Sequence, residues 1–504
     1  MNELSPNAAR AQEFANRVGK WVYRQMERIL ITAGEAEKQE TSGPAPSSAS
    51  SALSHDPPSQ AASHGRFSIH VAWTLATRLS MAVVTLLTGV IITRWLGAAG
   101  YGAFAVLNVA VAIAVQIGNA GLPSASLYFI SQDRRNLPSV AVISLSFALV
   151  VGSLLALGMI VLAARGSAPF SAIPLSVSVA AAISIPFQLL TLLGLNLFLG
   201  LGQIRRFNML DAAGQLSAML NAVISLIMIG AGLFALVSLN TVASFLVSLV
   251  IAWLIGREIL RKESEFAVGR AARLFGRMAG YSLKFHISIV LGLLIIRADL
   301  LIVEYFRGAA EAGVYAVASQ AASLLLLLPG VIGTLLFPRV ASARDMRGDI
   351  TCAVTRHTAF IMLIISLAAV PASFMLPVLF GAPFADATIQ FLLLLPGIYL
   401  LSIESVLVQH FTGTGFPAAI PLFWVAVFIV NIALNLSLVP LFGARGAALA
   451  SLVCYTMIFV LVAIYFRART GNSLSAALLL RAPELRRLWE MARFSSFPGG
   501  VNML

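Results

Sequence analysis

The chain has 504 residues, of which 59% are hydrophobic and 11% are charged. A soluble globular protein carries about 25% charged residues, so this composition excludes that class. The apolar residues fall into stretches of about 20–28, the length that a helix needs to cross a bilayer, which predicts a polytopic helical membrane protein. The net charge of +13 is therefore attributed to loops beside anionic lipid, and no nucleic-acid partner is expected.

Residues 1–66 are expected to form a cytoplasmic N-terminal extension, because no apolar segment suited to a signal peptide begins the chain. Within it, residues 9–31 have the pattern of an amphipathic helix. This helix either lies on anionic lipid, or it is solvated or packed against a partner. Residues 42–63 contain 8 Ser, 4 Pro and 5 Ala. That composition cannot bury a core and predicts a disordered linker.

Twelve apolar stretches follow, and each is expected to be a membrane-spanning helix. Six belong to an N-lobe at residues 67–256 and six to a C-lobe at residues 279–466, with a basic cytoplasmic loop at 257–278 between them. A cytoplasmic tail with a second amphipathic stretch is expected at 467–504. The expected spans are 69–95, 102–131, 139–163, 172–199, 209–230, 233–256, 281–305, 312–338, 353–380, 387–411, 418–441 and 444–466.

The lysines and arginines of the loops predict the orientation of the chain. With the N-terminus inside, thirteen of them fall in internal loops and four in external loops. Cytoplasmic loops carry an excess of positive charge in membrane proteins. Both termini are therefore expected on the cytoplasmic side.

The two lobes repeat one another in sequence. Gly97-Ala-Ala-Gly-Tyr-Gly-Ala-Phe-Ala-Val106 reappears 211 residues later as Gly308-Ala-Ala-Glu-Ala-Gly-Val-Tyr-Ala-Val317. Phe198-Leu-Gly-Leu-Gly202 matches Phe411-Thr-Gly-Thr-Gly415 at an offset of 213. Because each lobe has six spans, the repeats are parallel and related by an axis along the membrane normal. Two such bundles that face each other across a cavity form a transporter architecture.

Polar groups inside the spans are the candidate site residues, because a charge at the bilayer centre costs about 2.5–3.5 kcal/mol. Arg78 lies in the middle of the first span and is interpreted as a cavity-facing cation for an anionic substrate. An arginine that pairs with a neighbouring helix for packing is the alternative. Four threonines share its helix face and are expected to line the cavity: Thr74, Thr77, Thr85 and Thr88.

Asparagines in three other spans are further candidates for the cavity lining. Asn108 and Asn119 share one face of the second span. Asn221 in the fifth span matches Asn435 in the eleventh at an offset of 214. Amides in lipid also serve as hydrogen-bonded contacts between helices, and this second role stays open for all four.

The seventh span, which the repeat pairs with the first, carries a second set of charged groups. The offset of 211 directs Lys284, Ser288 and Asp299 towards the cavity. Arg297 lies about 160° around the helix from Asp299, so it lines the cavity if the helix breaks, and it is included as a third cation on that basis. Pairing with Glu304, or contact with another helix, is the alternative for Arg297.

The tenth span contains Glu404, which is a candidate carrier of a proton or cation or else a structural partner for one of the arginines. Cys352 and Cys454 have no neighbouring histidine, so neither a disulfide nor a metal site is expected. The sequence contains no GK[ST] phosphate-binding loop, no HExxH and no GxSxG. It therefore predicts neither ATP-driven transport nor an enzyme.

Several motifs within residues 66–466 resemble one family of exporters. They are Arg94-Trp-Leu-Gly-Ala-Ala-Gly-Tyr-Gly-Ala-Phe104, Gly121-Leu-Pro-Ser-Ala-Ser126, the Ser131-Gln-Asp-Arg-Arg135 loop, and Arg297-Ala-Asp-Leu-Leu-Ile-Val-Glu-Tyr-Phe-Arg-Gly308. Together they closely resemble the polysaccharide-repeat or O-antigen flippases (Wzx type) of the multidrug/oligosaccharidyl-lipid/polysaccharide (MOP) exporter superfamily. The long N-terminal extension departs from the usual short start of that family.

This resemblance implies an all-α fold with twelve transmembrane helices in two six-helix lobes, located in the bacterial inner membrane. It implies translocation of undecaprenyl-pyrophosphate-linked oligosaccharide repeat units from the cytoplasmic to the periplasmic leaflet by alternating access, for exopolysaccharide or O-antigen biosynthesis. No cofactor is implied, and a proton or sodium gradient would drive transport. Arg78, Lys284 and Arg297 match the cations of the cavity, and Asp299 and Glu404 are the candidate ion-coupling acids.

The expected partners are the lipid-linked oligosaccharide and membrane lipids, together with a polysaccharide polymerase or glycosyltransferase that the tails would recruit. Three other functions are weighed against the flippase. A drug or cation antiporter of the same superfamily requires an acidic cavity, whereas the first span offers Arg78 and no acid. A lipid II flippase would have fourteen spans. A scaffold would act through its tails without transport.

Overall fold

The computed structural model describes residues 60–167, 169–260, 268–343 and 345–480. Within these ranges, only the backbone is described for residues 60–77, 79, 268–272, 279, 281–285 and 338. The predicted amphipathic segment at 9–31, most of the linker at 42–63 and the end of the tail lie outside the described residues. Each regular element among the described residues is a helix, which confirms the all-α prediction.

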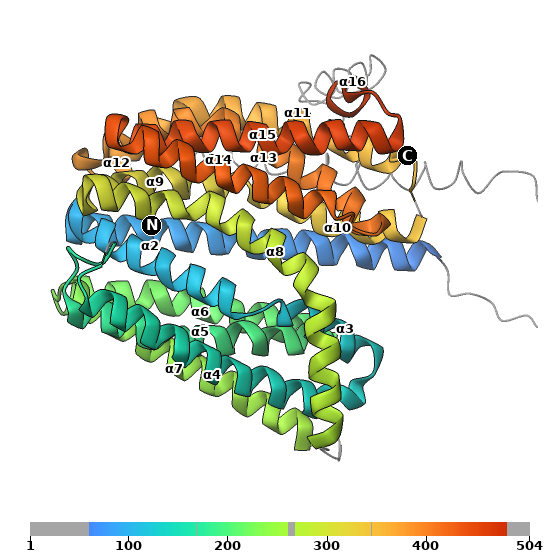
Figure 1. The fold of residues 1–504 in the computed structure, drawn as a ribbon, viewed down its shortest axis with the longest axis horizontal. Helices are drawn as coiled ribbons and strands as arrows, with labels where there is room; N and C mark the ends of the chain where they lie inside the picture. Colours follow the sequence, from blue (N-terminus) through green and yellow to red (C-terminus); the bar gives the residue numbers. More distant parts are fainter. Residues whose placement is uncertain (1–59, 168, 261–267, 344, 481–504) are drawn as a thin grey trace, which may run out of the picture.

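The first half of the chain supplies the lower group of helices in Figure 1 together with the long helix α2. Its elements are α2 (Gln60–Gly118), α3 (Leu122–Gln132), η1 (Arg134–Asn136), α4 (Leu137–Ala164), α5 (Leu175–Gly200), α6 (Ile204–Ala222), η2 (Val223–Met228, a π-helical turn) and α7 (Leu233–Leu260). Helix α5 packs against both α4 and α7, so these three form the centre of the group. α2 already begins at Gln60, so the last residues assigned to the linker are helical.

The second half supplies the upper group of helices in Figure 1. Its elements are α8 (Val268–Arg307), α9 (Ala309–Leu324), α10 (Leu327–Ala343), α11 (Asp349–Ser373), α12 (Leu376–Phe380), η3 (Ala382–Phe384), α13 (Ala387–Thr414), α14 (Ala419–Phe442), α15 (Ala444–Thr470) and α16 (Leu474–Leu478). Helix α8 contacts α3 and α4 near its start and α9, α14 and α15 farther on, so it joins the two groups.

Eleven helices of the described residues are long and apolar enough to cross a membrane. The first, Ser80–Gly118, has 39 residues, and its backbone leaves the helical region at Gly97, where φ is 66° and ψ is −173°. This one candidate span covers parts of the first two expected spans, with the break at Gly97 between them, so the structure gives eleven candidate spans where twelve were expected. The remaining ten correspond one by one to the other expected spans.

The second expected span, 102–131, is interrupted in the structure. α2 ends at Gly118 and α3 begins at Leu122. Ala120 and Gly121 between them have φ values of 48° and 74°, a left-handed conformation that ends a helix. The turn residues Asn119, Gly121 and Pro123 are the sequence signal that could have indicated this break within the apolar stretch.

The internal repeat reappears in the backbone geometry. Gly308 has φ 82° and ψ 171°, close to the values at Gly97, which it matches in sequence. Gly202 and Gly415 both have positive φ, and in each copy the residue that follows donates its amide to the phenylalanine carbonyl five residues earlier. These conformations favour glycine because it has no Cβ. The matching glycines therefore mark equivalent turns of two similarly folded halves.

The two halves meet closely at one end of the molecule, here called the α12 end, and diverge towards the opposite α16 end (Figure 1). At the α12 end, a Cβ on Gly102 would lie 1.7 Å from the Ala309 carbonyl oxygen. A Cβ on Gly313 would lie 2.1 Å from the Ala98 carbonyl oxygen. The reciprocal contacts show that the repeated glycines let α2 and α9 approach backbone to backbone.

An arginine of the repeated motif adds a polar contact at the α12 end. Arg94 donates from Nε to the Leu379 carbonyl at 2.9 Å and from Nη2 to the Val378 carbonyl. These carbonyls belong to the last turn of α12, where helix carbonyls lack partners of their own and the helix dipole is negative. The contact joins α2 to the second half at the same end as the glycine packing.

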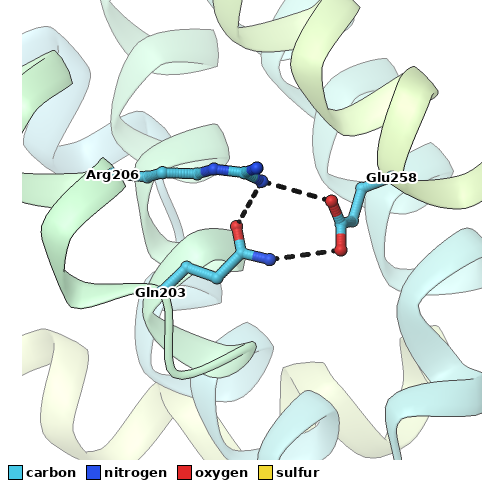
Figure 2. A network of polar contacts seen from close by, with 3 residues as sticks. All are labelled: Gln203, Arg206 and Glu258. Atoms are coloured by element: carbon cyan, nitrogen blue, oxygen red, sulfur yellow. Dashed lines mark hydrogen bonds and ion pairs between the residues drawn. The ribbon is translucent and has the colours of Figure 1, made fainter.

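A hydrogen-bonded network fastens the α5–α6 turn to the end of α7 (Figure 2). Gln203 Nε2 donates to Glu258 Oε1 at 3.1 Å, and Arg206 Nη1 lies 2.8 Å from Gln203 Oε1 and 3.2 Å from Glu258 Oε2. The Glu258 side chain is 12% exposed and that of Arg206 is 44% exposed. The network holds α6 against α7 at the end opposite α12.

Replacing Glu258 with alanine is expected to lower the free energy of unfolding by about 1 kcal/mol. The half-exposed arginine regains water, so the loss stays small. Thermal unfolding of the purified protein in detergent measures it. Asp386→Asn removes a more exposed ion pair, between Asp386 and Arg445, and serves as the control with no measurable change. A Glu258→Ala protein as stable as that control would show that the network contributes nothing.

Candidate functional site

A cavity of about 290 Å³ lies between the two halves. It is bounded by α2 from the first half and by α8 and α9 from the second. Its lining combines apolar and polar side chains: Thr85, Tyr101, Phe104, Ala105, Asn108, Val109, Ile296, Arg297, Asp299, Leu300, Ala316, Ser319 and Gln320. Four sequence-predicted site residues therefore meet here, namely Thr85, Asn108, Arg297 and Asp299.

Arg297 supplies the positive charge of this cavity. Its side chain is half-buried, and within the part of the chain that the structure describes it forms no ion pair within 4.0 Å. Asp299 attracts it electrostatically without direct contact. A half-buried guanidinium without a bonded anion retains its donors for a ligand, and its planar fork suits a phosphate or carboxylate.

Asp299 forms one wall of the cavity but is bonded to the protein. The residue is 1% exposed, and its carboxylate accepts hydrogen bonds from the Leu300 amide at 2.8 Å, the Ser451 hydroxyl at 3.0 Å and the Tyr315 hydroxyl. These bonds join α8 to α9 and α15. Asp299 therefore stabilises the second half of the molecule at the edge of the cavity.

Three polar residues of the cavity lining, Tyr101, Ser319 and Gln320, were not predicted from the sequence. The Tyr101 hydroxyl donates to Gln320 Oε1 at 2.7 Å across the interface of the halves, and Ser319 lies beside Gln320. Tyr101 stands in the repeated glycine motif, which could have drawn attention to it. Gln320 and Ser319 lie in the eighth span without any charged neighbour, so no sequence signal pointed to them.

Arg78 lies outside this cavity lining and forms an ion pair with α6. Its Nη1 is 3.7 Å from Asp211 Oδ2. A second polar contact joins α2 and α6: Thr85 Oγ1 donates to Gln215 Oε1 at 3.3 Å. Asp211 was missed in the sequence although it is an acidic residue inside a predicted span, which is the signal that could have identified it.

Four other predicted residues, Thr88, Asn119, Asn221 and Asn435, have hydrogen-bond partners in the protein. Thr88 donates to the Val84 carbonyl, and Asn119 Oδ1 accepts from the Gly121 amide, which closes the turn between α2 and α3. Asn221 bonds to Leu239 and Asn240 of α7, and Asn435 to the Asn431 carbonyl. None of these four lines the cavity. Of these four, Asn221 bonds to another helix, which is the alternative role weighed for the asparagines, whereas Thr88 and Asn435 bond within their own helices.

Ser288 and Glu404 are buried away from the cavity lining. The Ser288 hydroxyl and Glu404 Oε1 have no hydrogen-bond partner among the described residues. Glu404 is 2% exposed on α13, which packs against α9, α10, α11 and α15. Thr74, Thr77 and Lys284 belong to α2 and α8, but their side chains lie outside the described residues.

A sequence model of a family described as polysaccharide biosynthesis proteins matches residues 70–344. No curated protein sequence matches the chain significantly. Among solved structures, an inward-facing multidrug resistance MATE family transporter of the MOP superfamily matches with a TM-score of 0.63 at 14% identity, over 79% of this chain and 98% of that one. The lipid II flippase MurJ in an inward closed conformation matches with a TM-score of 0.60 at 14% identity, over 84% and 93%.

An outward-facing MATE family transporter also matches, with a TM-score of 0.54 at 12% identity over 79% of this chain and 95% of that one. At these identities the likeness shows a shared fold. The chain therefore has the all-helical fold of the MATE transporter and MurJ structures, as expected from the sequence.

Proposed function

The chain belongs to the polysaccharide biosynthesis protein family, and from this premise we propose that it is a flippase for lipid-linked oligosaccharide. Its substrate would be the undecaprenyl-pyrophosphate-linked repeat unit of an exopolysaccharide or O-antigen. The observation that carries the proposal is the half-buried Arg297, which lies in a cavity between two repeated halves and has no ion-pair partner among the described residues. Hydroxyl and amide groups beside it suit the sugars of such a substrate.

The chemistry of the cavity favours a diphosphate over a cationic drug. A diphosphate carries at least two negative charges, and arginine keeps its charge at any physiological pH. Asp299, the acid of the cavity lining, is already bonded to Tyr315 and Ser451 and is therefore poorly placed to hold a cation of the substrate. A drug antiporter of the same fold would need a free acid there.

Alternating access is supported by the way the halves meet. They pack closely at the α12 end and diverge towards the α16 end, where the positive-inside count places the cytoplasm. The described conformation would then be open on the cytoplasmic side of the inner membrane, where it would receive substrate. Outward opening would break the glycine contacts and the bonds of Arg94.

The energy source is proposed to be a proton or sodium gradient, with Asp299 and Glu404 as coupling acids. Glu404 is buried, and its Oε1 has no hydrogen-bond partner among the described residues. The protonation of a buried carboxyl group depends strongly on its surroundings, so a conformational change can load or release a proton there. A polymerase or glycosyltransferase remains the proposed partner of the two tails.

The proposal is tested by depletion of the protein in its host and mass spectrometry of the extracted lipids. Depletion is expected to accumulate an undecaprenyl-diphosphate repeat unit. Re-expressed wild type is expected to clear this intermediate. Arg297→Ala is expected to leave at least about tenfold more of the intermediate than wild type, because the loss of one charge-assisted phosphate contact can weaken substrate binding by that factor. Arg445→Ala, an exposed arginine paired with Asp386, is the matched control and is expected to clear the intermediate as wild type does.

Two other results would replace the proposal. Accumulation of lipid II would assign the protein to cell-wall synthesis, a reading that the match to MurJ favours. Loss of dye efflux without any accumulating lipid would indicate a drug antiporter. If Arg297→Ala clears the lipid-linked intermediate at the wild-type rate, Arg297 does not bind the substrate.

A further inference from the structure

The ion pair between Arg78 and Asp211 is looser than the others of the described residues. Arg78 Nη1 lies 3.7 Å from Asp211 Oδ2, beyond hydrogen-bond distance, with the side chains 45% and 27% exposed. The pairs Arg206–Glu258, Arg307–Glu311 and Arg445–Asp386 are hydrogen-bonded at 3.0–3.2 Å. Charges at 3.7 Å still attract, but neither group has its hydrogen-bonding capacity used by the other.

This pair lies on the face of α2 that leads into the cavity. Thr85 lines the cavity and follows Arg78 by seven residues, which is close to two helical turns, so the two side chains share a face. They are about 10 Å apart along the helix. On α6, Asp211 and Gln215 are one turn apart and contact Arg78 and Thr85 respectively. Two polar contacts between α2 and α6 therefore follow one another from the cavity towards the α16 end.

An arginine inside a membrane protein needs a counter-ion, because an unpaired charge in a low dielectric is strongly unfavourable. Asp211 provides one when the site is empty. A diphosphate offers two or more negative charges and oxygens spaced for bidentate bonding, so it competes effectively for a guanidinium that is attracted but not hydrogen-bonded. The exchange leaves the arginine neutralised in both states.

We propose that Asp211 is the resting counter-ion of Arg78 and is displaced by the diphosphate of the substrate; this rests on the proposed function. Because Asp211 competes for Arg78, it lowers the affinity for the diphosphate, and it pairs with Arg78 again when the substrate leaves. Asp211 is therefore a positioning residue that sets how tightly the headgroup is held.

The test measures binding of farnesyl diphosphate to the purified full-length protein in detergent, with farnesol as the probe that lacks the charged headgroup. Asp211→Asn keeps the size of the side chain and removes the competing charge. It is expected to bind farnesyl diphosphate about tenfold more tightly than wild type, equivalent to about 1.4 kcal/mol, without a change for farnesol. Arg78→Ala/Asp211→Asn is expected to lose this gain. Asp386→Asn, another acid paired with an arginine, controls for the change in net charge and is expected to bind as wild type does.

The outcomes separate the two proposals. Equal affinity of wild type and Asp211→Asn for farnesyl diphosphate, with both preferring it to farnesol, would overturn the counter-ion role and leave the flippase proposal standing. A gain that persists in Arg78→Ala/Asp211→Asn would also overturn it, because the effect would not act through Arg78. A wild type that binds farnesyl diphosphate no better than farnesol would contradict the proposed diphosphate substrate and this inference with it. Asp211→Ser repeats the comparison with a smaller side chain, so that a folding defect of one variant does not decide the result.

Discussion

Replacing Gly102 with alanine is expected to lower the free energy of unfolding by about 1–3 kcal/mol and to separate the two halves at the α12 end. The added Cβ would lie 1.7 Å from the Ala309 carbonyl oxygen and 2.9 Å from the Gly313 amide nitrogen. Both are backbone atoms, which cannot rotate aside as a flexible side chain can. The helices α2 and α9 must therefore move apart, and the repeat predicts the same effect for Gly313→Ala.

Thermal unfolding in detergent measures the loss of stability, and spin labels on the exposed positions 95 and 378 measure the separation at the α12 end, after replacement of the two native cysteines. Gly158→Ala in α4 is the matched control, because a Cβ there meets nothing within 4 Å and alanine favours the helix. Its unfolding temperature is expected to equal or exceed that of wild type. A Gly102→Ala protein with the stability and label distances of this control would contradict the backbone contact.

Replacing Asp299 with alanine is expected to lower the free energy of unfolding by about 2–5 kcal/mol. The carboxylate accepts three hydrogen bonds, and its loss would leave the hydroxyls of Tyr315 and Ser451 fully buried without their acceptor. Because these groups belong to α8, α9 and α15, the second half of the molecule would loosen at the wall of the cavity. Thermal unfolding of the purified protein is again the measurement.

Asp299→Asn distinguishes the structural role of this group from a role in ion coupling. The amide keeps the shape and an oxygen acceptor, so about 1 kcal/mol of destabilisation is expected. Transport driven by the ion gradient is expected to fall at least about tenfold, because the amide cannot exchange a proton or bind a cation as a carboxylate does. Tyr315→Phe removes one hydrogen-bond donor to Asp299 and retains the carboxylate of Asp299. This variant is therefore expected to lose stability but to keep gradient-driven transport. Normal transport by Asp299→Asn would restrict Asp299 to its structural role.

The membrane fold could be predicted from local sequence properties. Apolar stretches of spanning length determine where helices cross, since backbone polar groups in lipid must be bonded within the helix. The repeated motif predicted that Gly97 and Gly308 are equivalent, and their backbone angles agree. The repeat directed Asp299 towards the cavity, and Asp299 lines it; Arg297 lines it as well, although helix periodicity placed it about 160° away from Asp299.

The partners of the polar residues were decided by tertiary packing alone. In lipid a polar side chain on a helix can face a cavity, bond to another helix or close a turn, and all three satisfy the same need for a hydrogen-bond partner. Asn119 closes a turn, Asn221 bonds to α7, and Arg78 attracts Asp211. The sequence by itself determined that the chain is a bundle of membrane-spanning helices, that its two halves repeat and which residues are polar within the helices. Which of those residues share the cavity depended on the neighbouring helix, because a single helix face does not specify what packs against it.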